Sequence, residues 1–75
     1  MKFRQLSIAG SWEITPVLRG DPRGMFMEFY RFDHLAAEVG HPLRLAQGNL
    51  SVSARGVVRG IHFADVPPGQ AKYVT

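Results

Sequence analysis

Residues 46–53 alternate strictly between two kinds of side chain, and this pattern limits the possible folds more than any other feature. The first set is polar and uncharged: Gln47, Asn49, Ser51 and Ser53. The second set is small or apolar: Ala46, Gly48, Leu50 and Val52. A period of two places the two sets on opposite faces of a β-strand. We therefore expect a strand here, with one face that is polar but carries no charge.

Similar short stretches recur along the chain and are separated by glycine and proline. The expected strands cover residues 3–8, 12–18, 25–32, 46–53, 57–63 and 70–75. Turns are expected at 20–24, 55–56 and 65–69, where glycine, proline, arginine and aspartate gather. One helix is expected over residues 34–39, with Asp33 as its N-cap and Gly40 closing it. Closely spaced strands with such turns predict a mainly β, antiparallel sandwich or barrel with one short helix.

The composition limits the compartment and the partners. The chain has 75 residues, no cysteine and a net charge of +3. Its arginines are scattered, which argues against a nucleic-acid-binding arm or a basic membrane-binding segment. No apolar run approaches the roughly 20 residues of a membrane helix, and the lack of cysteine excludes a disulfide framework. We therefore expect a soluble, cytoplasmic chain that binds neither nucleic acid nor membrane.

A histidine and a lysine flank the turn expected at residues 65–69. If this turn closes a five-residue hairpin loop, His62 lies directly opposite Lys72. Directly opposed residues share a face, with Cβ atoms roughly 5 Å apart. Histidine is the usual general base near neutral pH, and a neighbouring ammonium can stabilise a developing enolate oxygen. The pair suits proton abstraction beside a carbonyl. The competing interpretation is a surface hairpin whose His and Lys face water.

Other polar residues favour a site for a polar ligand. Small uncharged donors and acceptors along one strand face suit a sheet that lines such a ligand. Arg23 lies in a glycine-flanked turn, where a guanidinium can grip a phosphate with two parallel hydrogen bonds. Phe26 and Glu28 follow on one expected strand face, as a ring to stack and a carboxylate to accept hydrogen bonds. Core packing and a solvated charge are the alternatives for these two residues.

The sequence predicts no metal site. No two histidines stand one residue apart on an expected strand, and His34 and His41 lie beside the helix, at positions typical of a surface. A covalent nucleophile is also poorly supported, because there is no cysteine and no serine in a Gly-x-Ser-x-Gly turn.

Three stretches resemble the motifs of the dTDP-4-dehydrorhamnose 3,5-epimerase family: DPRGMFMEFYR (21–31), QGNLSVSARGVVRGIHF (47–63) and PPGQAKYV (67–74). The resemblance implies an antiparallel jelly-roll (cupin) barrel, and a homodimer in which N-terminal strands extend the partner's sheet. It also implies a dTDP-4-keto-6-deoxyhexose substrate and no cofactor. His62 matches the base, Lys72 the residue that stabilises the enolate, and Arg59 an arginine that contacts the substrate. The positions that hold the nucleotide and its diphosphate are matched by Arg23, Phe26, Glu28, Gln47 and Asn49.

The chain also departs from this family. Phe63 and Ala64 follow the histidine where Tyr-Gln is expected, which resembles the branch that acts in deoxysugar pathways for antibiotic decoration. Neither Tyr30 nor Tyr73 matches the family's tyrosine acid, which falls after residue 75, as does the aspartate that orients the histidine. Since the chain stops within a strand-like run, we expect residues 1–75 to be the N-terminal segment of a single cupin domain, inactive alone. The alternatives are a non-catalytic cupin that only binds a nucleotide sugar, and a module that only dimerises.

Overall fold

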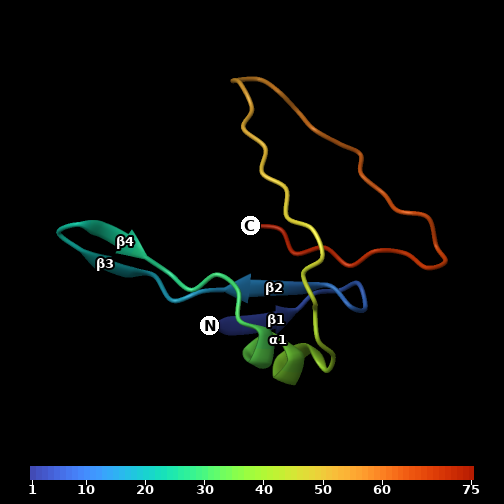
Figure 1. The fold of residues 1–75 in the computed structure, drawn as a ribbon, viewed down its shortest axis with the longest axis horizontal. Coiled ribbons are helices and arrows are strands. Elements are labelled where there is room, and N and C mark those ends of the chain that lie inside the picture. Colours follow the sequence, from blue (N-terminus) through green and yellow to red (C-terminus); the bar gives the residue numbers. More distant parts are fainter. The chain divides into compact units, whose positions relative to one another are not determined.

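The computed structural model describes residues 1–75, which divide into two units, Met1–Arg44 and Leu45–Thr75. The first unit holds four strands, paired as two antiparallel hairpins, and one helix (Figure 1). The second unit holds neither helix nor strand. No helix here is long and apolar enough to cross a membrane.

The first hairpin joins β1 (Lys2–Gln5) to β2 (Trp12–Thr15), with Phe3 directly opposite Ile14. Trp12 and Ile14 are half-buried, as is Phe3 across the ladder, while Glu13 and Thr15 are exposed. The strand predicted over residues 12–18 is therefore confirmed over Trp12–Thr15, with one half-buried face. Both strands are shorter than predicted. β1 ends at Gln5, because the connection already begins at Leu6, whose N–H donates to the carbonyl of Ser11 at 2.8 Å. β2 ends at Thr15, just before Pro16, which has no N–H to donate to a ladder.

The second hairpin joins β3 (Arg19–Asp21) to β4 (Gly24–Phe26) through the two residues Pro22 and Arg23. The turn predicted at 20–24 is confirmed. β4 ends at Phe26, so the strand expected over 25–32 is wrong beyond that residue. All six residues of the two strands are exposed, so little apolar burial stabilises this hairpin.

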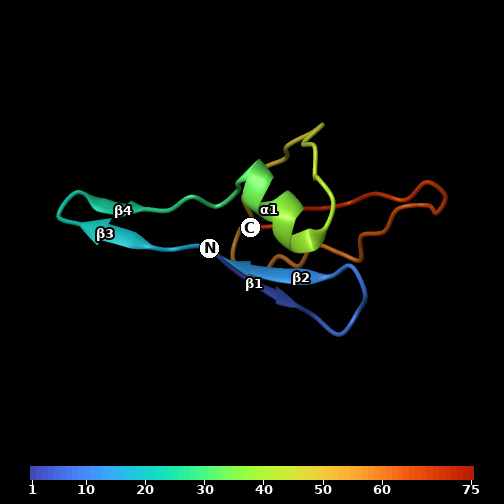
Figure 2. The same cartoon turned by 90° about the horizontal axis from the view of Figure 1, so that it is seen from below.

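The helix α1 spans Phe32–Val39 and begins two residues before the predicted start. Asp33 is not its N-cap: Arg31 holds that position in an extended conformation, and Asp33 lies in the first turn. The Asp33 carboxylate instead accepts a hydrogen bond from Nε of Arg31 at 2.9 Å. Gly40 closes the helix as predicted, in the left-handed conformation that glycine adopts at little cost. Leu35 on this helix is buried, and Figure 2 shows α1 near the β1–β2 hairpin.

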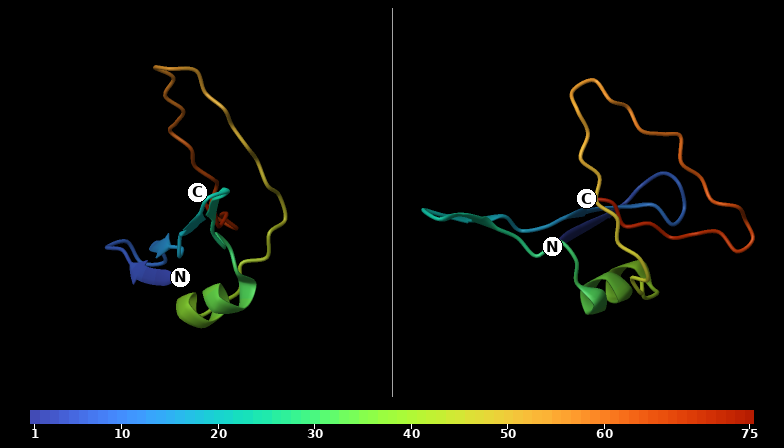
Figure 3. Two further views of the ribbon diagram at one scale, coloured as in Figure 1. Left: turned by 90° about the vertical axis from the view of Figure 1, so that its left-hand side faces the viewer. Right: turned by 45° about the horizontal axis from the view of Figure 1, so that its top comes forward.

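Residues 45–75 follow an extended path with two turns (Figure 3). The turns predicted at 55–56 and 65–69 are confirmed, the second closed by the Gly69 N–H donating to the Asp65 carbonyl at 2.8 Å. The strands predicted over 46–53, 57–63 and 70–75 are not formed in this structure. An extended segment gains stability as a strand only with paired neighbours and a covered face. Here both are missing, since Leu50 and Ile61 are 92% and 95% exposed.

Candidate functional site

The predicted site residues divide between the two units. Arg23, Phe26 and Glu28 belong to the first unit and lie on or just after the β3–β4 hairpin. The others lie on the extended path of the second unit: Gln47, Asn49, Arg59, His62 and Lys72.

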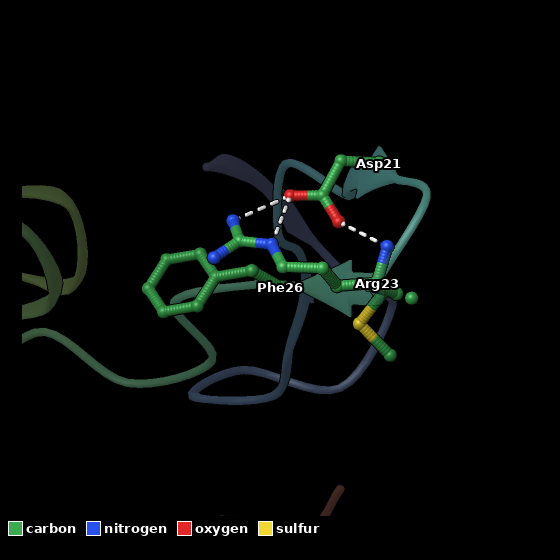
Figure 4. Close-up of a pocket in the computed structure, with 5 residues that line it drawn as sticks. Asp21, Arg23 and Phe26 are labelled. Carbon is green, nitrogen blue, oxygen red and sulfur yellow. Dashed lines mark hydrogen bonds and ion pairs between the residues drawn. The ribbon is translucent and has the colours of Figure 1, made fainter.

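The turn between β3 and β4 holds Arg23 in a network with Asp21 (Figure 4). The backbone N–H of Arg23 donates to Asp21 Oδ1 at 2.8 Å. Its guanidinium donates to Asp21 Oδ2 from Nε at 3.2 Å and from Nη2 at 2.7 Å. A shallow surface hollow is lined by these two residues together with Gly24, Met25 and Phe26. Arg23 and Phe26 therefore line the same surface hollow, and their roles as ligand residues stay predictions.

The electrostatics of this turn follow from the same contacts. Hydrogen bonds from the Arg23 side chain, and then from its backbone, lower the pKa of the Asp21 carboxyl below its ordinary value. The carboxylate is therefore charged throughout the neutral range. The Arg23 side chain remains 88% exposed, so its guanidinium is available to a further anion.

Glu28 lies outside this hollow and is engaged elsewhere. Its Oε1 is 3.7 Å from Nη1 of Arg31, which also binds Asp33. These carboxylates raise the pKa of the Arg31 guanidinium, chiefly through the hydrogen bond that Arg31 donates to Asp33. Because β4 ends at Phe26, the predicted strand face shared by Phe26 and Glu28 is not formed.

Two predicted ligand residues of the second unit touch each other. Gln47 Nε2 donates to Asn49 Oδ1 at 3.1 Å, so these alternate side chains lie on the same side of the extended path. The two-residue period of the sequence predicted this arrangement. Together they present an uncharged cluster of amide donors and acceptors.

Arg59 spans the turn at residues 55–56. Its Nε donates to Ser53 Oγ at 2.6 Å, and its Nη2 donates to the carbonyl of Val52 at 3.3 Å. The guanidinium thus joins the segments before and after this turn by hydrogen bonds. The contacts of Arg59 with Ser53 and of Arg23 with Asp21 were not predicted from the sequence. A signal for the second pair was present, since aspartate stands two residues before arginine in a turn.

His62 and Lys72 are exposed and lie on either side of the 65–69 turn. Since residues 57–63 and 70–75 form no ladder, the predicted face-to-face pairing is not formed in this structure. The catalytic roles of these two residues stay predictions. No three His, Cys, Asp or Glu side chains gather closely enough to hold a metal ion.

Known proteins match this chain along its whole length. The sequence model of the dTDP-4-dehydrorhamnose 3,5-epimerase family matches residues 5–75. A dTDP-4-dehydrorhamnose 3-epimerase of Streptomyces niveus is 68% identical over 75 residues, covering 100% of this chain and 36% of its own length. A dTDP-4-dehydrorhamnose 3,5-epimerase of Mycolicibacterium smegmatis is 60% identical over 75 residues, covering 100% of this chain and 37% of its own.

A solved structure also matches closely. It is a 4-keto-6-deoxy sugar epimerase from the novobiocin biosynthetic gene cluster of Streptomyces spheroides, 65% identical, with a TM-score of 0.85. The match covers 92% of this chain and 35% of that one. This match, the two hairpins and α1 confirm the predicted fold class, the mainly β N-terminal portion of a cupin jelly roll. The chain spans about a third of the length of the curated relatives it matches.

Proposed function

Because this chain belongs to the dTDP-4-dehydrorhamnose 3,5-epimerase family, we propose that it forms the N-terminal part of a cofactor-independent epimerase of a dTDP-4-keto-6-deoxyhexose. The observation that carries the proposal is the family match over residues 5–75. We use "full-length enzyme" for a protein that contains residues 1–75 and has the length of these relatives.

The proposed chemistry is proton removal beside the C4 ketone. The imidazole of His62 takes the proton from C3 or C5, and the electrons of that C–H bond form an enolate. The ammonium of Lys72 stabilises the negative charge on the enolate oxygen. An acid outside residues 1–75 then returns a proton to the opposite face of the same carbon. No electron is gained or lost overall, so the reaction needs no oxidant or reductant.

The substrate's nucleotide and diphosphate supply the remaining contacts. Arg23 is the proposed diphosphate ligand, supported by its 88% exposed side chain beside the hollow that Phe26 also lines. Gln47 and Asn49 offer amide groups that already lie side by side. Glu28 and Arg59 complete the proposed ligand set. To bind substrate, Glu28 must leave Arg31 and Arg59 must leave Ser53.

The full-length enzyme is proposed to supply the neighbouring strands with which residues 45–75 would form a sheet. Their uncovered apolar side chains support this, since Leu50, Val58 and Ile61 are each more than nine-tenths exposed. Strand pairing there would place His62 opposite Lys72. We also propose a cytoplasmic homodimer, because the chain lacks cysteine and the two-stranded β1–β2 sheet has open edges on which a second copy could add strands.

The name of one relative points to one position on the sugar. The protein that shares 68% identity is named a 3-epimerase, and the matching solved structure comes from an antibiotic gene cluster. We therefore propose C3 as the main site of epimerisation, in the synthesis of a deoxysugar that decorates an antibiotic. Phe63 and Ala64, which follow the proposed base, agree with this branch.

The test compares two histidine variants of the full-length enzyme in deuterated water. With dTDP-4-keto-6-deoxyglucose, His62→Ala should slow deuterium entry at C3 by about 10²- to 10⁴-fold, the usual contribution of a general base. His41→Ala is the matched control and should leave the rate unchanged, because this exposed ring lies beside the backbone carbonyl of Pro42. Unchanged exchange in His62→Ala would remove the assigned base. Substrate binding without any exchange in the wild-type enzyme would favour a non-catalytic nucleotide-sugar-binding cupin.

A further inference from the structure

The carboxylate of Asp21 accepts three hydrogen bonds from Arg23, and its two oxygens accept from different parts of that residue. Oδ1 accepts the backbone N–H of Arg23, which fixes the turn. Oδ2 accepts both Nε and Nη2 of the same residue, which fixes the direction of the guanidinium. Pro22 between them has a restricted φ, and Gly24 after them has a φ of +133°, which favours glycine. The local chain therefore holds the two charged groups together.

The contact with Asp21 occupies only one edge of the guanidinium. Arginine has five N–H donors, and Asp21 takes one on Nε and one on Nη2. Three donors remain, both on Nη1 and the second on Nη2. Of these, the N–H of Nη2 and one N–H of Nη1 form a second parallel pair, the geometry that grips two oxygens of a phosphate. With 88% of the Arg23 side chain exposed, solvent reaches this edge.

We propose that Asp21 is a positioning residue, which holds Arg23 so that its Nη1–Nη2 edge faces the diphosphate of the substrate. This inference rests on the proposed function, in which Arg23 is the diphosphate ligand. Asp21 does not touch the substrate itself, because a carboxylate would repel it. Its effect is to order a long, flexible side chain before the ligand arrives.

The positioning role and simple electrostatics predict opposite effects of an Asp21→Asn substitution on binding. Removing a negative charge beside an anion site should strengthen binding if charge alone matters. If positioning dominates, Asp21→Asn should weaken binding about three- to tenfold, the factor expected when one flexible side chain must be ordered on binding. Asparagine keeps an oxygen for the Arg23 backbone N–H, so the turn itself is retained.

The experiment measures dTDP binding to the full-length enzyme by titration calorimetry. The variants are Asp21→Asn, Arg23→Ala and the double variant, with Glu38→Gln as a control that removes an equal charge from the exposed side of α1. Arg23→Ala and Asp21→Asn should both weaken binding. In the Arg23→Ala background, Asp21→Asn should add less than about a twofold change, and Glu38→Gln should bind like the wild type. The rate of deuterium exchange at saturating substrate should stay within about twofold in Asp21→Asn.

Each contrary result has a distinct meaning. Unchanged binding in Arg23→Ala would overturn the proposed diphosphate ligand. Weaker binding in Arg23→Ala, with unchanged or tighter binding in Asp21→Asn, would overturn only the positioning role. The positioning role would also be overturned if Asp21→Asn weakened dTDP binding equally in the wild-type and Arg23→Ala backgrounds. Asp21 would then act through the conformation of the turn and not through the Arg23 side chain.

Discussion

Truncation of Leu35 should destabilise the first unit, because Leu35 is its buried apolar side chain at 5% exposure. Leu35→Ala removes three carbon atoms, worth about 2.4 kcal/mol at about 0.8 kcal/mol for each buried CH₂. Its helical neighbours Ala36 and Val39 are only half-buried, so the site can partly collapse and the cavity term stays small. We expect a loss of about 2–3 kcal/mol, at the low end for buried leucines.

Amide hydrogen exchange of residues 1–75 measures this loss directly. Protection of the amides of α1 should fall roughly 30- to 140-fold, since about 1.4 kcal/mol corresponds to a factor of ten. Leu50→Ala is the matched control, because the same truncation occurs at a side chain that is 92% exposed. Leu50→Ala should change the free energy of opening of the α1 amides by less than about 0.5 kcal/mol. Equal effects of the two variants would refute the conclusion that burial in the first unit stabilises this chain.

Three further results are expected. The hydrogen bonds from Arg4 lower the pKa of Glu13. The pair therefore stabilises the β1–β2 hairpin above the ordinary glutamate pKa, and this stabilisation is lost as the pH falls through the lowered pKa. A carboxyl ¹³C titration should show a higher pKa of Glu13 in Arg4→Gln, and a titration curve identical to that of the wild type would contradict this. Gly24→Ala should destabilise the β3–β4 hairpin by at least about 1 kcal/mol, because alanine rarely adopts its φ of +133°. Gly20→Ala should be tolerated, since its Cβ would lie 3.9 Å from the nearest atom. Equal amide protection in the two variants would contradict the predicted backbone strain at residue 24. Lys72→Gln in the full-length enzyme should reduce isotope exchange about 10²- to 10³-fold while dTDP binding is retained, and undiminished exchange would remove Lys72 from the mechanism.

Features of this fold that depend on a few neighbouring residues could be predicted from the sequence. The alternation of Trp12 and Ile14 with charged and polar residues identified a strand with one half-buried face. Gly40 identified the end of the helix, because few other residues adopt its conformation. The predicted start of the helix was wrong, because Asp33 lies within the first turn, where its carboxylate binds Arg31, and the N-cap is Arg31 itself.

Features that depend on distant chain could not be predicted in this way. The alternation over residues 46–53 correctly placed Gln47 and Asn49 on one side, but a strand also needs a hydrogen-bonded neighbour. The face-to-face placement of His62 and Lys72 depends on such pairing and is therefore not formed by residues 45–75. The contact between Asp21 and Arg23, by contrast, is local, and an aspartate two residues before an arginine in a turn was the signal that could have predicted it.

The most direct test of the proposed epimerase is isotope exchange by the wild-type full-length enzyme. It is incubated with dTDP-4-keto-6-deoxyglucose in deuterated water, without added metal, and the C3 and C5 proton signals are followed by NMR. We predict that the C3 signal disappears first as deuterium enters, which would demonstrate enolate chemistry beside the C4 ketone. Retention of both protons by an enzyme with bound substrate would contradict the account and leave His62 and Lys72 as recognition residues.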